Sequence, residues 1–364
     1  MSHIYMQINT NTLNENLLKI KGVVQEEVKI MAVVKSDAYG HGSIPIANSL
    51  IDDVDYFGVG FLSEAIELRE AGIETPILVM GPTYDFESIV EYNITLTIIS
   101  IEQYKQMLDW TKEQKKVISF HLKVDTGMHR FGINLDELEE FMILYDSTFT
   151  KMEGIYSHFA TTYKTNKKAV MKQKNLFDKF VRYFKENNME LIYHIANSEN
   201  AIDFEEARYD MVRIGNGLYG SSNSKKRIGL KKIAKLKVKV VSLKEVKKGE
   251  RIGYGLNYKA KKDITIAVIP FGFYDGCGLV KKPLGVNFTS VIKYYMKEIF
   301  RFLFRNRTIF YYNEIELPFI GKPTMQYTLV KVKNNEINIG DEIEVRVSPI
   351  FINKSIPRIY NGGL

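Results

Sequence analysis

One lysine stands at the end of an apolar run and opens a loop of small residues. The segment reads AVVKSDAYGHG over residues 32–42, and its lysine is Lys35. A lysine at a strand end can form a Schiff base with an aldehyde cofactor. Tyr39 can hydrogen-bond a phosphate, and Gly40 and Gly42 allow the backbone to approach a ligand closely. Alone, such a lysine is more often a surface residue, but the full string predicts a cofactor-binding lysine.

The elements that would position Lys35 alternate between apolar runs and helical patterns from residue 1 to about residue 230. The near-continuous apolar character of the runs is typical of strands buried on both faces. Eight strands separated by helices predict a (β/α)₈ TIM-type barrel, with chemistry at the C-terminal strand ends. A doubly wound open sheet is the alternative. The expected strands are Val28–Val34, Tyr56–Phe61, Pro76–Met80, Leu96–Ser100, Val117–Val124, Met152–His158, Leu191–Ala196 and Met211–Ile214, with helical patterns at Ile44–Leu50, Leu62–Ala71, Leu135–Leu144 and Lys167–Asn187.

The hydrophobic pattern of the sequence changes from about residue 235, where apolar and polar residues alternate as in strands. We therefore predict a barrel domain over residues 1–234 and a C-terminal β-rich domain over residues 235–364. The strand-like runs are Lys235–Val246, Thr265–Pro270, Thr308–Tyr312, Glu316–Ile320, Tyr327–Val332 and Glu342–Val347.

One stretch of the second domain, Phe288–Arg305, has helical periodicity. Its apolar residues share one face, and Lys293, Lys297, Arg301 and Arg305 recur every four residues on another. A basic amphipathic helix can contact anionic lipid. The favoured interpretation is a helix packed on its own β-domain, with a solvated basic edge.

The bulk numbers describe an ordinary globular chain with a net charge of +7 and one cysteine, Cys277. No secretory signal or apolar span of about 20 residues is visible, so we expect a cytoplasmic location. The excess of lysine is interpreted as surface charge for solubility, and no nucleic-acid partner or metal is expected.

Seven blocks in the chain resemble the alanine racemase family, whose members carry pyridoxal phosphate on a fold of type III. The resemblance runs collinearly from the first strand to nearly the C-terminus. Its blocks are AVVKSDAYGHG (32–42), HLKVDTGMHRFGI (121–133), YSHFA (156–160), HIANSEN (194–200), DMVRIGNGLYG (210–220), RIGYG (251–255) and IPFGFYDG (269–276), and IPRIY (356–360) continues the series.

The resemblance implies a two-base racemisation of a small amino acid, with L-alanine and D-alanine as the default pair and D-alanine biosynthesis as the role. Lys35 would act on one face of the α-carbon and Tyr254 on the other. His158 would assist the tyrosine, because tyrosine hydroxyls ordinarily ionise near pH 10. Arg213 would face the pyridine nitrogen and keep it unprotonated.

The resemblance also implies the remaining contacts. Arg130 would bind the substrate carboxylate, with Met325 nearby. Lys123 corresponds to a lysine that many members carbamylate to hold this arginine; an unmodified lysine paired with an acid is the alternative. The residues that correspond to the cofactor and phosphate site are Lys35, Tyr39, His158, Asn197, Ser198, Arg213, Gly215 and Asn216.

The chain departs from the family pattern around the expected entrance. Gln326 replaces an aspartate beside Met325, and Lys354 stands where a tyrosine is usual. Tyr163, Phe273 and Cys277 are further departures, and the Phe288–Arg305 stretch looks like an insertion. These changes leave the substrate open between alanine and another amino acid such as serine.

Two other classes remain as alternatives: a catalytically weakened pyridoxal phosphate-binding paralogue, and a decarboxylase of the related barrel-plus-β-domain family. By resemblance, Tyr254 belongs to the site of a partner subunit. We therefore expect a head-to-tail homodimer with shared active sites.

Overall fold

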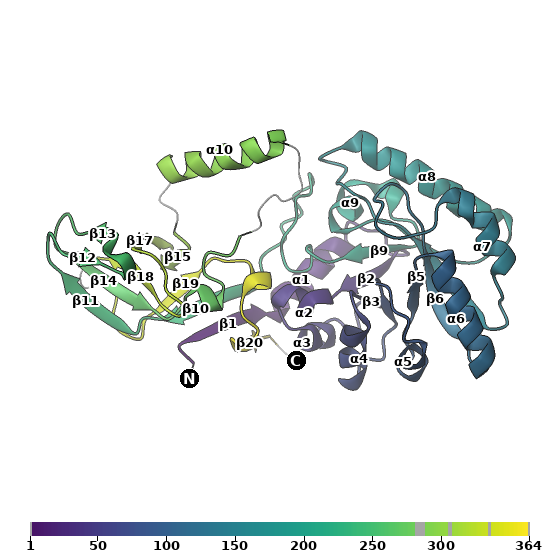
Figure 1. The fold of residues 1–364 in the computed structure, drawn as a ribbon, viewed down its shortest axis with the longest axis horizontal. Coiled ribbons are helices and arrows are strands. Elements are labelled where there is room, and N and C mark those ends of the chain that lie inside the picture. Colours follow the sequence, from purple (N-terminus) through teal and green to yellow (C-terminus); the bar gives the residue numbers. More distant parts are fainter. Residues whose placement is uncertain (1, 281–287, 305–307, 334–335, 363–364) are drawn as a thin grey trace. The chain divides into compact units, whose positions relative to one another are not determined.

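A computed structural model describes residues 2–280, 288–304, 308–333 and 336–362 of the 364-residue chain. These residues form two compact units, drawn in Figure 1. The barrel unit comprises Asn9–Ile233, and the β-unit comprises the residues up to Ile8 together with Ala234–Asn361.

The barrel unit is built from eight parallel strands that follow one another in chain order. Strands β4-β3-β2-β9 form one half and β5-β6-β7-β8 the other. Parallel bridges Leu78↔Thr95 and Asn197↔Arg213 join the two halves at both seams. The predicted TIM-type barrel is thus confirmed, and the open sheet is excluded. The strands are β2 (Lys29–Val33), β3 (Tyr56–Val59), β4 (Ile77–Val79), β5 (Leu96–Ile98), β6 (Ile118–Lys123), β7 (Thr150–Tyr156), β8 (Ile192–His194) and β9 (Met211–Ile214).

Helices surround the barrel strands in the order that the sequence pattern predicts (Figure 1). Helix α8 shows the cause most clearly, because Val170, Phe177, Phe180 and Phe184 are buried along one side of it. The Asn166 side chain caps its first turn by accepting from the Ala169 N–H at 3.1 Å. The helices are α1 (Thr10–Lys21), α2 (Lys35–Gly40), α3 (Ser43–Asn48), α4 (Leu62–Glu70), α5 (Phe86–Glu91), α6 (Ile101–Gln114), α7 (Leu138–Leu144), α8 (Lys167–Glu186) and α9 (Ser198–Asp203).

The β-unit contains a six-stranded sheet in the order β16-β15-β19-β10-β1-β20, a four-stranded sheet β11-β14-β18-β17 and the pair β12-β13. Buried and less buried residues alternate along β18 and β19, as expected for strands with one covered face. Its strands are β1 (Ile4–Asn9), β10 (Ala234–Lys239), β11 (Ser242–Val246), β12 (Arg251–Ile252), β13 (Tyr258–Lys259), β14 (Ile264–Ile269), β15 (Phe310–Tyr312), β16 (Ile315–Leu317), β17 (Phe319–Ile320), β18 (Thr328–Val332), β19 (Glu342–Val345) and β20 (Arg358–Asn361).

The first strand corrects one sequence expectation, which grouped residues 1–8 with the barrel. Strand β1 pairs antiparallel with β10, with Met6 opposite Leu236. Met6 and Ile8 are buried whereas Gln7 between them is only partly so. This alternation suits a sheet with one covered face, unlike the fully buried strands of the barrel.

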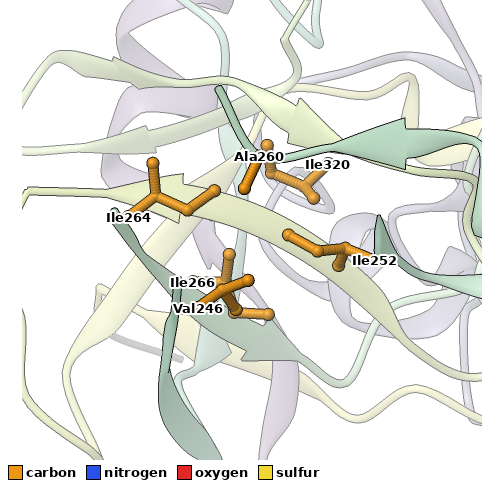
Figure 2. Packing of buried hydrophobic residues seen from close by; sticks show 6 residues of the cluster. All are labelled: Val246, Ile252, Ala260, Ile264, Ile266 and Ile320. Carbon is orange, nitrogen blue, oxygen red and sulfur yellow. The ribbon is translucent and has the colours of Figure 1, made fainter. Parts of the chain in front are cut away.

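A compact apolar cluster holds the four-stranded sheet against the β12-β13 pair (Figure 2). Its members come from segments that are separate in the sequence, so packing fixes the loops between them. They are Val246, Ile252, Ala260, Ile264, Ile266 and Ile320.

The amphipathic stretch is a helix, α10 (Phe288–Phe304), as predicted; Arg305 lies outside the described residues. The expected packing on its own β-domain is not seen over Phe288–Phe300. Every residue from Phe288 to Phe300 is exposed or only partly buried. Within the described ranges, no helix combines the length and apolar character needed to cross a membrane.

Candidate active site

Lys35 follows β2 and begins a left-handed helical turn. Ser36, Asp37, Ala38 and Tyr39 all have positive φ, between 49° and 57°. Left-handed backbone costs an ordinary residue about 1–2 kcal/mol, so four in succession need support from their surroundings. The residue pattern predicts only a loop here.

Glu64, which lies in none of the sequence motifs, supplies part of that support. Its carboxylate accepts the Ser36 N–H at 2.5 Å and the Gly60 N–H at 2.7 Å. The first turn of α4 therefore ties the end of β3 to the residue after Lys35. The only sequence signal was an acid in the first turn of a helix, where carboxylates are common for other reasons.

The environment of Lys35 favours its neutral amine. Burial lowers the pKa of Lys35, and the nearby charges of Arg130 and Arg213 lower it further, against the opposing effect of Glu64. A neutral amine is the form that attacks an aldehyde. The position therefore suits a lysine that binds a carbonyl cofactor.

Arg213, on β9, is a buried cation held by neutral groups. Its guanidinium donates to the Ser157 carbonyl at 2.6 Å, the Ile195 carbonyl at 3.0 Å and the His194 carbonyl at 3.1 Å. Among the described residues no carboxylate pairs with it. Burial lowers the pKa of Arg213 to about 10, which leaves it charged at neutral pH.

The same guanidinium fixes the proton positions of three histidines. It donates to Nδ1 of His158 at 3.2 Å and to Nδ1 of His194 at 2.8 Å. Each ring must then carry its proton on Nε2. His194 Nε2 lies 2.8 Å from His121 Nδ1, so the same order continues to His121. Burial and Arg213 hold the pKa of His158 and His194 well below the usual value.

A small polar cradle lies where β9 ends and α9 begins. Ser198 Oγ accepts the Gly215 N–H at 3.0 Å and the Gly217 N–H at 3.3 Å. A Cβ on Gly215 would lie 2.6 Å from the Tyr39 hydroxyl, so only glycine lets that hydroxyl approach. The Asn197 side chain accepts the Asn200 N–H at 3.1 Å and caps α9.

One aromatic residue, Tyr219, contacts both Tyr39 and the strand that precedes Lys35. The Tyr39 ring lies 5.1 Å from the Tyr219 ring, whose hydroxyl donates to the Val33 carbonyl at 3.0 Å. Burial raises the pKa of Tyr39 to about 12, so its hydroxyl keeps its proton and can donate. Tyr219 lies within the DMVRIGNGLYG block, but the sequence did not indicate its role.

Lys123, the last residue of β6, is buried, and no acidic side chain pairs with it among the described residues. Its Nζ lies 4.0 Å from the centre of the Tyr156 ring, and its side chain forms no ion pair within the described part of the chain. Burial and the charge of Arg213 hold its pKa well below the usual value. Among the described residues, the structure therefore offers no acid for the alternative in which Lys123 forms an ion pair.

These groups converge on one cavity of about 510 Å³ at the C-terminal ends of the barrel strands. All its walls belong to the barrel unit. Arg130, which is itself exposed, lines it together with Phe131. The predicted residues on its wall are Lys35, Tyr39, Lys123, Arg130, His158, Asn197, Ser198, Arg213, Gly215 and Asn216.

Tyr254 and Met325 belong to the β-unit and do not line this cavity. Both side chains are exposed, Tyr254 at 81%. Gly253 and Gly321 bring their loops together, since a Cβ on Gly253 would lie 3.6 Å from the Gly321 Cα. Both glycines have positive φ. The β-unit thus presents the two predicted residues on neighbouring loops.

The departures from the family pattern have separate structural settings. Tyr163 stacks on Phe204 with ring centres 4.5 Å apart. Cys277 is buried, whereas Phe273 and Lys354 are exposed.

An eight-stranded α/β barrel has its chemistry at the C-terminal ends of its strands, where Lys35 and the buried Arg213 line the cavity. This arrangement is typical of enzymes that bind a carbonyl compound as an imine on a lysine. Comparison with known proteins gives the family. The family model for the alanine racemase N-terminal domain matches residues 8–223, and that for the C-terminal domain matches residues 233–349.

Similar proteins extend over nearly the whole chain. Alanine racemase 1 of Caldanaerobacter subterraneus subsp. tengcongensis is 32% identical, over 98% of this chain and 94% of that protein. Alanine racemase of Methanococcus maripaludis is 32% identical, over 95% and 89%. The solved structure of alanine racemase from Clostridium difficile 630 has a TM-score of 0.87 at 29% identity, covering 99% of this chain and 96% of that one.

The chain belongs to the alanine racemase family of pyridoxal phosphate-dependent isomerases. The resemblance predicted from the sequence blocks is confirmed. The same relatives give no support to the decarboxylase class or to a weakened paralogue.

Proposed function

We propose that this chain interconverts L-alanine and D-alanine with pyridoxal phosphate held on Lys35. The observation that carries the proposal is that one cavity is lined both by a lysine with a lowered pKa, Lys35, and by a buried arginine, Arg213, that has no acidic partner among the described residues. The names of the relatives support alanine as the substrate, and one similar structure, from Bacillus anthracis, contains bound L-Ala-P.

The cavity residues fit the cofactor in three respects. The Tyr39 hydroxyl and the Ser198 hydroxyl, which the Gly215 N–H holds in place, form a cradle suited to a phosphate, and a side chain on Gly215 would fill it. Arg213 offers a donor that does not lose its proton at neutral pH, which suits an unprotonated ring nitrogen. Lys35 offers an amine for the aldehyde.

When bound, pyridoxal phosphate supplies an electron sink that makes the α-proton of the amino acid removable. The chain's own residues then orient the substrate and move the proton. Arg130 reaches the cavity without an acidic partner in the described structure, so it is available for the substrate carboxylate. Lys35 would take or return the proton at its Nζ on one face.

We assign the proton transfer on the other face to the Tyr254 hydroxyl of a partner subunit. An 81% exposed side chain needs a second surface to exclude water from it. His158 would support that hydroxyl. With Nδ1 occupied by Arg213, Nε2 of His158 carries the proton and is the atom left for a further hydrogen bond. We therefore infer a homodimer with shared sites, in the cytoplasm.

The first test is proton exchange and trapping on the purified full chain with pyridoxal phosphate. We expect solvent deuterium to enter the α-carbon of either alanine enantiomer, and borohydride to fix the cofactor on Lys35 as found by peptide mass. Lys35→Ala should abolish both. Lys29→Ala, at the opposite end of the same strand, is the matched control. A trapped cofactor without exchange on alanine, but with exchange on serine, would replace the substrate assignment.

The second test mixes two inactive variants, Lys35→Ala and Tyr254→Phe. If sites are shared, a mixed dimer contains one site with both functional groups, and random exchange restores roughly a quarter of wild-type sites. If each chain supplies its own tyrosine, mixing restores no activity.

A further inference from the structure

Helix α10 leaves a set of large apolar side chains in water. Phe288, Ile292, Tyr295, Met296 and Ile299 are 77%, 44%, 58%, 61% and 52% exposed. At about 100° per residue they fall in one half of the helix surface. A contiguous exposed apolar face of this kind marks an interaction site.

The other half of the helix is basic. Lys293 and Lys297 are exposed and one turn apart. Residues 281–307 of the sequence contain seven lysines or arginines and one acidic residue, Glu298. This segment therefore contributes a net charge of +6, against +7 for the whole chain. The basic half of α10 therefore lies in a segment with almost no acidic residues to neutralise it.

The apolar half and the basic half of α10 together indicate what kind of partner this helix binds. A second copy that paired its own α10 with this one would bring two lysine stripes together, and they would repel each other. A nucleic acid would satisfy the charge but leave the apolar half in water. An anionic bilayer satisfies both halves, with acyl chains below and headgroups around the lysines.

We propose that α10 is a membrane-surface anchor that lies in the interface of an anionic lipid bilayer. The helix has 17 residues, fewer than the roughly 20 apolar residues needed to span the hydrocarbon core, and it carries charge along its length. It therefore lies along the surface instead of crossing it. This proposal is independent of the reaction catalysed in the barrel.

The test is flotation of the full chain with pyridoxal phosphate on vesicles. We expect binding to mixed phosphatidylglycerol and phosphatidylcholine vesicles, weakening as salt is raised, and little binding to pure phosphatidylcholine. Each basic residue near an anionic surface strengthens binding roughly fivefold. Lys293→Gln with Lys297→Gln should therefore weaken it roughly 25-fold.

A matched control is Lys261→Gln with Lys262→Gln, two exposed lysines on the same unit, which should leave vesicle binding unchanged. The apolar half is tested by Ile292→Glu with Ile299→Glu, which should abolish flotation. Should that variant misfold, Tyr295→Trp gives an independent measurement. The chain has one natural tryptophan, Trp110, on the barrel unit, so a blue shift relative to wild type reports insertion at α10.

Three outcomes would overturn the proposal. They are absence of flotation on anionic vesicles, equal losses for the control and the α10 lysine pairs, and an unshifted Trp spectrum with vesicles. Self-association of the wild type that the Ile292 and Ile299 changes remove, without any lipid binding, would assign the face to a second copy instead.

Discussion

Gly215→Ala tests whether the cradle beside Tyr39 holds the cofactor phosphate. The added methyl group would lie 2.6 Å from the Tyr39 hydroxyl and 3.2 Å from its ring carbon Cζ. Ordinary van der Waals contacts of a Cβ begin at 3.4 Å. The hydroxyl must therefore move by the better part of an ångström. Gly215 does not have positive φ, so the backbone itself tolerates alanine.

The expected penalty follows from how tightly Tyr39 is held. Its ring packs against Tyr219, so it cannot move freely while it remains in the cradle. Overpacking of this kind costs about 1–3 kcal/mol. Without cofactor, Tyr39 can turn away and relieve the contact. We therefore expect the penalty to fall on binding, weakening the Kd for pyridoxal phosphate roughly 5- to 150-fold.

The assay is a titration of apo-enzyme with pyridoxal phosphate, read by visible absorbance, in a double-mutant cycle with Tyr39→Phe. Removal of the hydroxyl takes away the closest contact, so Gly215→Ala should cost much less in the Tyr39→Phe background. We expect a coupling energy of about 1–2 kcal/mol. The melting temperature of each apo variant reports any effect on folding itself.

Strict additivity of the two changes would refute the argument, because it would show that the methyl group and the hydroxyl do not compete for one space. An unchanged Kd for Gly215→Ala alone would likewise show that Tyr39 does not occupy the cradle in the bound state.

Three further predictions concern the charges around the cavity. Because Arg130 lowers the pKa of Lys35, Arg130→Gln should raise that pKa and shift the pH profile of the cofactor association rate to higher pH. Stopped-flow absorbance measures this rate, and an unshifted midpoint would contradict the prediction. Lys123 has a lowered pKa and no acid partner among the described residues, so its neutral amine should bind carbon dioxide. NMR in ¹³C-bicarbonate should show a carbamate resonance that is absent in Lys123→Gln, and identical spectra would disprove the prediction. Arg213→Lys leaves buried carbonyls without donors and should lower the free energy of unfolding by about 1–3 kcal/mol; a urea midpoint equal to wild type would refute this.

The sequence predicted the barrel well because its signal is local and repeated. Continuous apolar runs such as Tyr56–Val59 are buried on both faces in the structure, as their composition implies. The cavity residues were found through motif order, which places strand-end residues together once a barrel is assumed.

The exceptions depend on long-range pairing. Strand β1 pairs with β10, more than 200 residues later, and no local pattern specifies a partner so distant. The exposed state of α10 was likewise missed, because an amphipathic pattern states only that one half is apolar. It does not state whether protein or lipid covers that half.

The histidine chain shows what kind of information a sequence lacks even when the residues are known. His121 and His158 stood in quoted blocks, yet their proton positions follow only from Arg213 donating to two rings at once. At the other end of this series of histidines, His121 Nε2 is buried and has no hydrogen-bond partner among the described residues. Because the N–H at His121 Nε2 makes no hydrogen bond, it does little to hold the three histidines in their present tautomers. The tautomers are therefore set at the other end, by Arg213, which can only donate. The proton on His158 Nε2, which we assign to the support of Tyr254, is therefore determined from the buried side of the cavity.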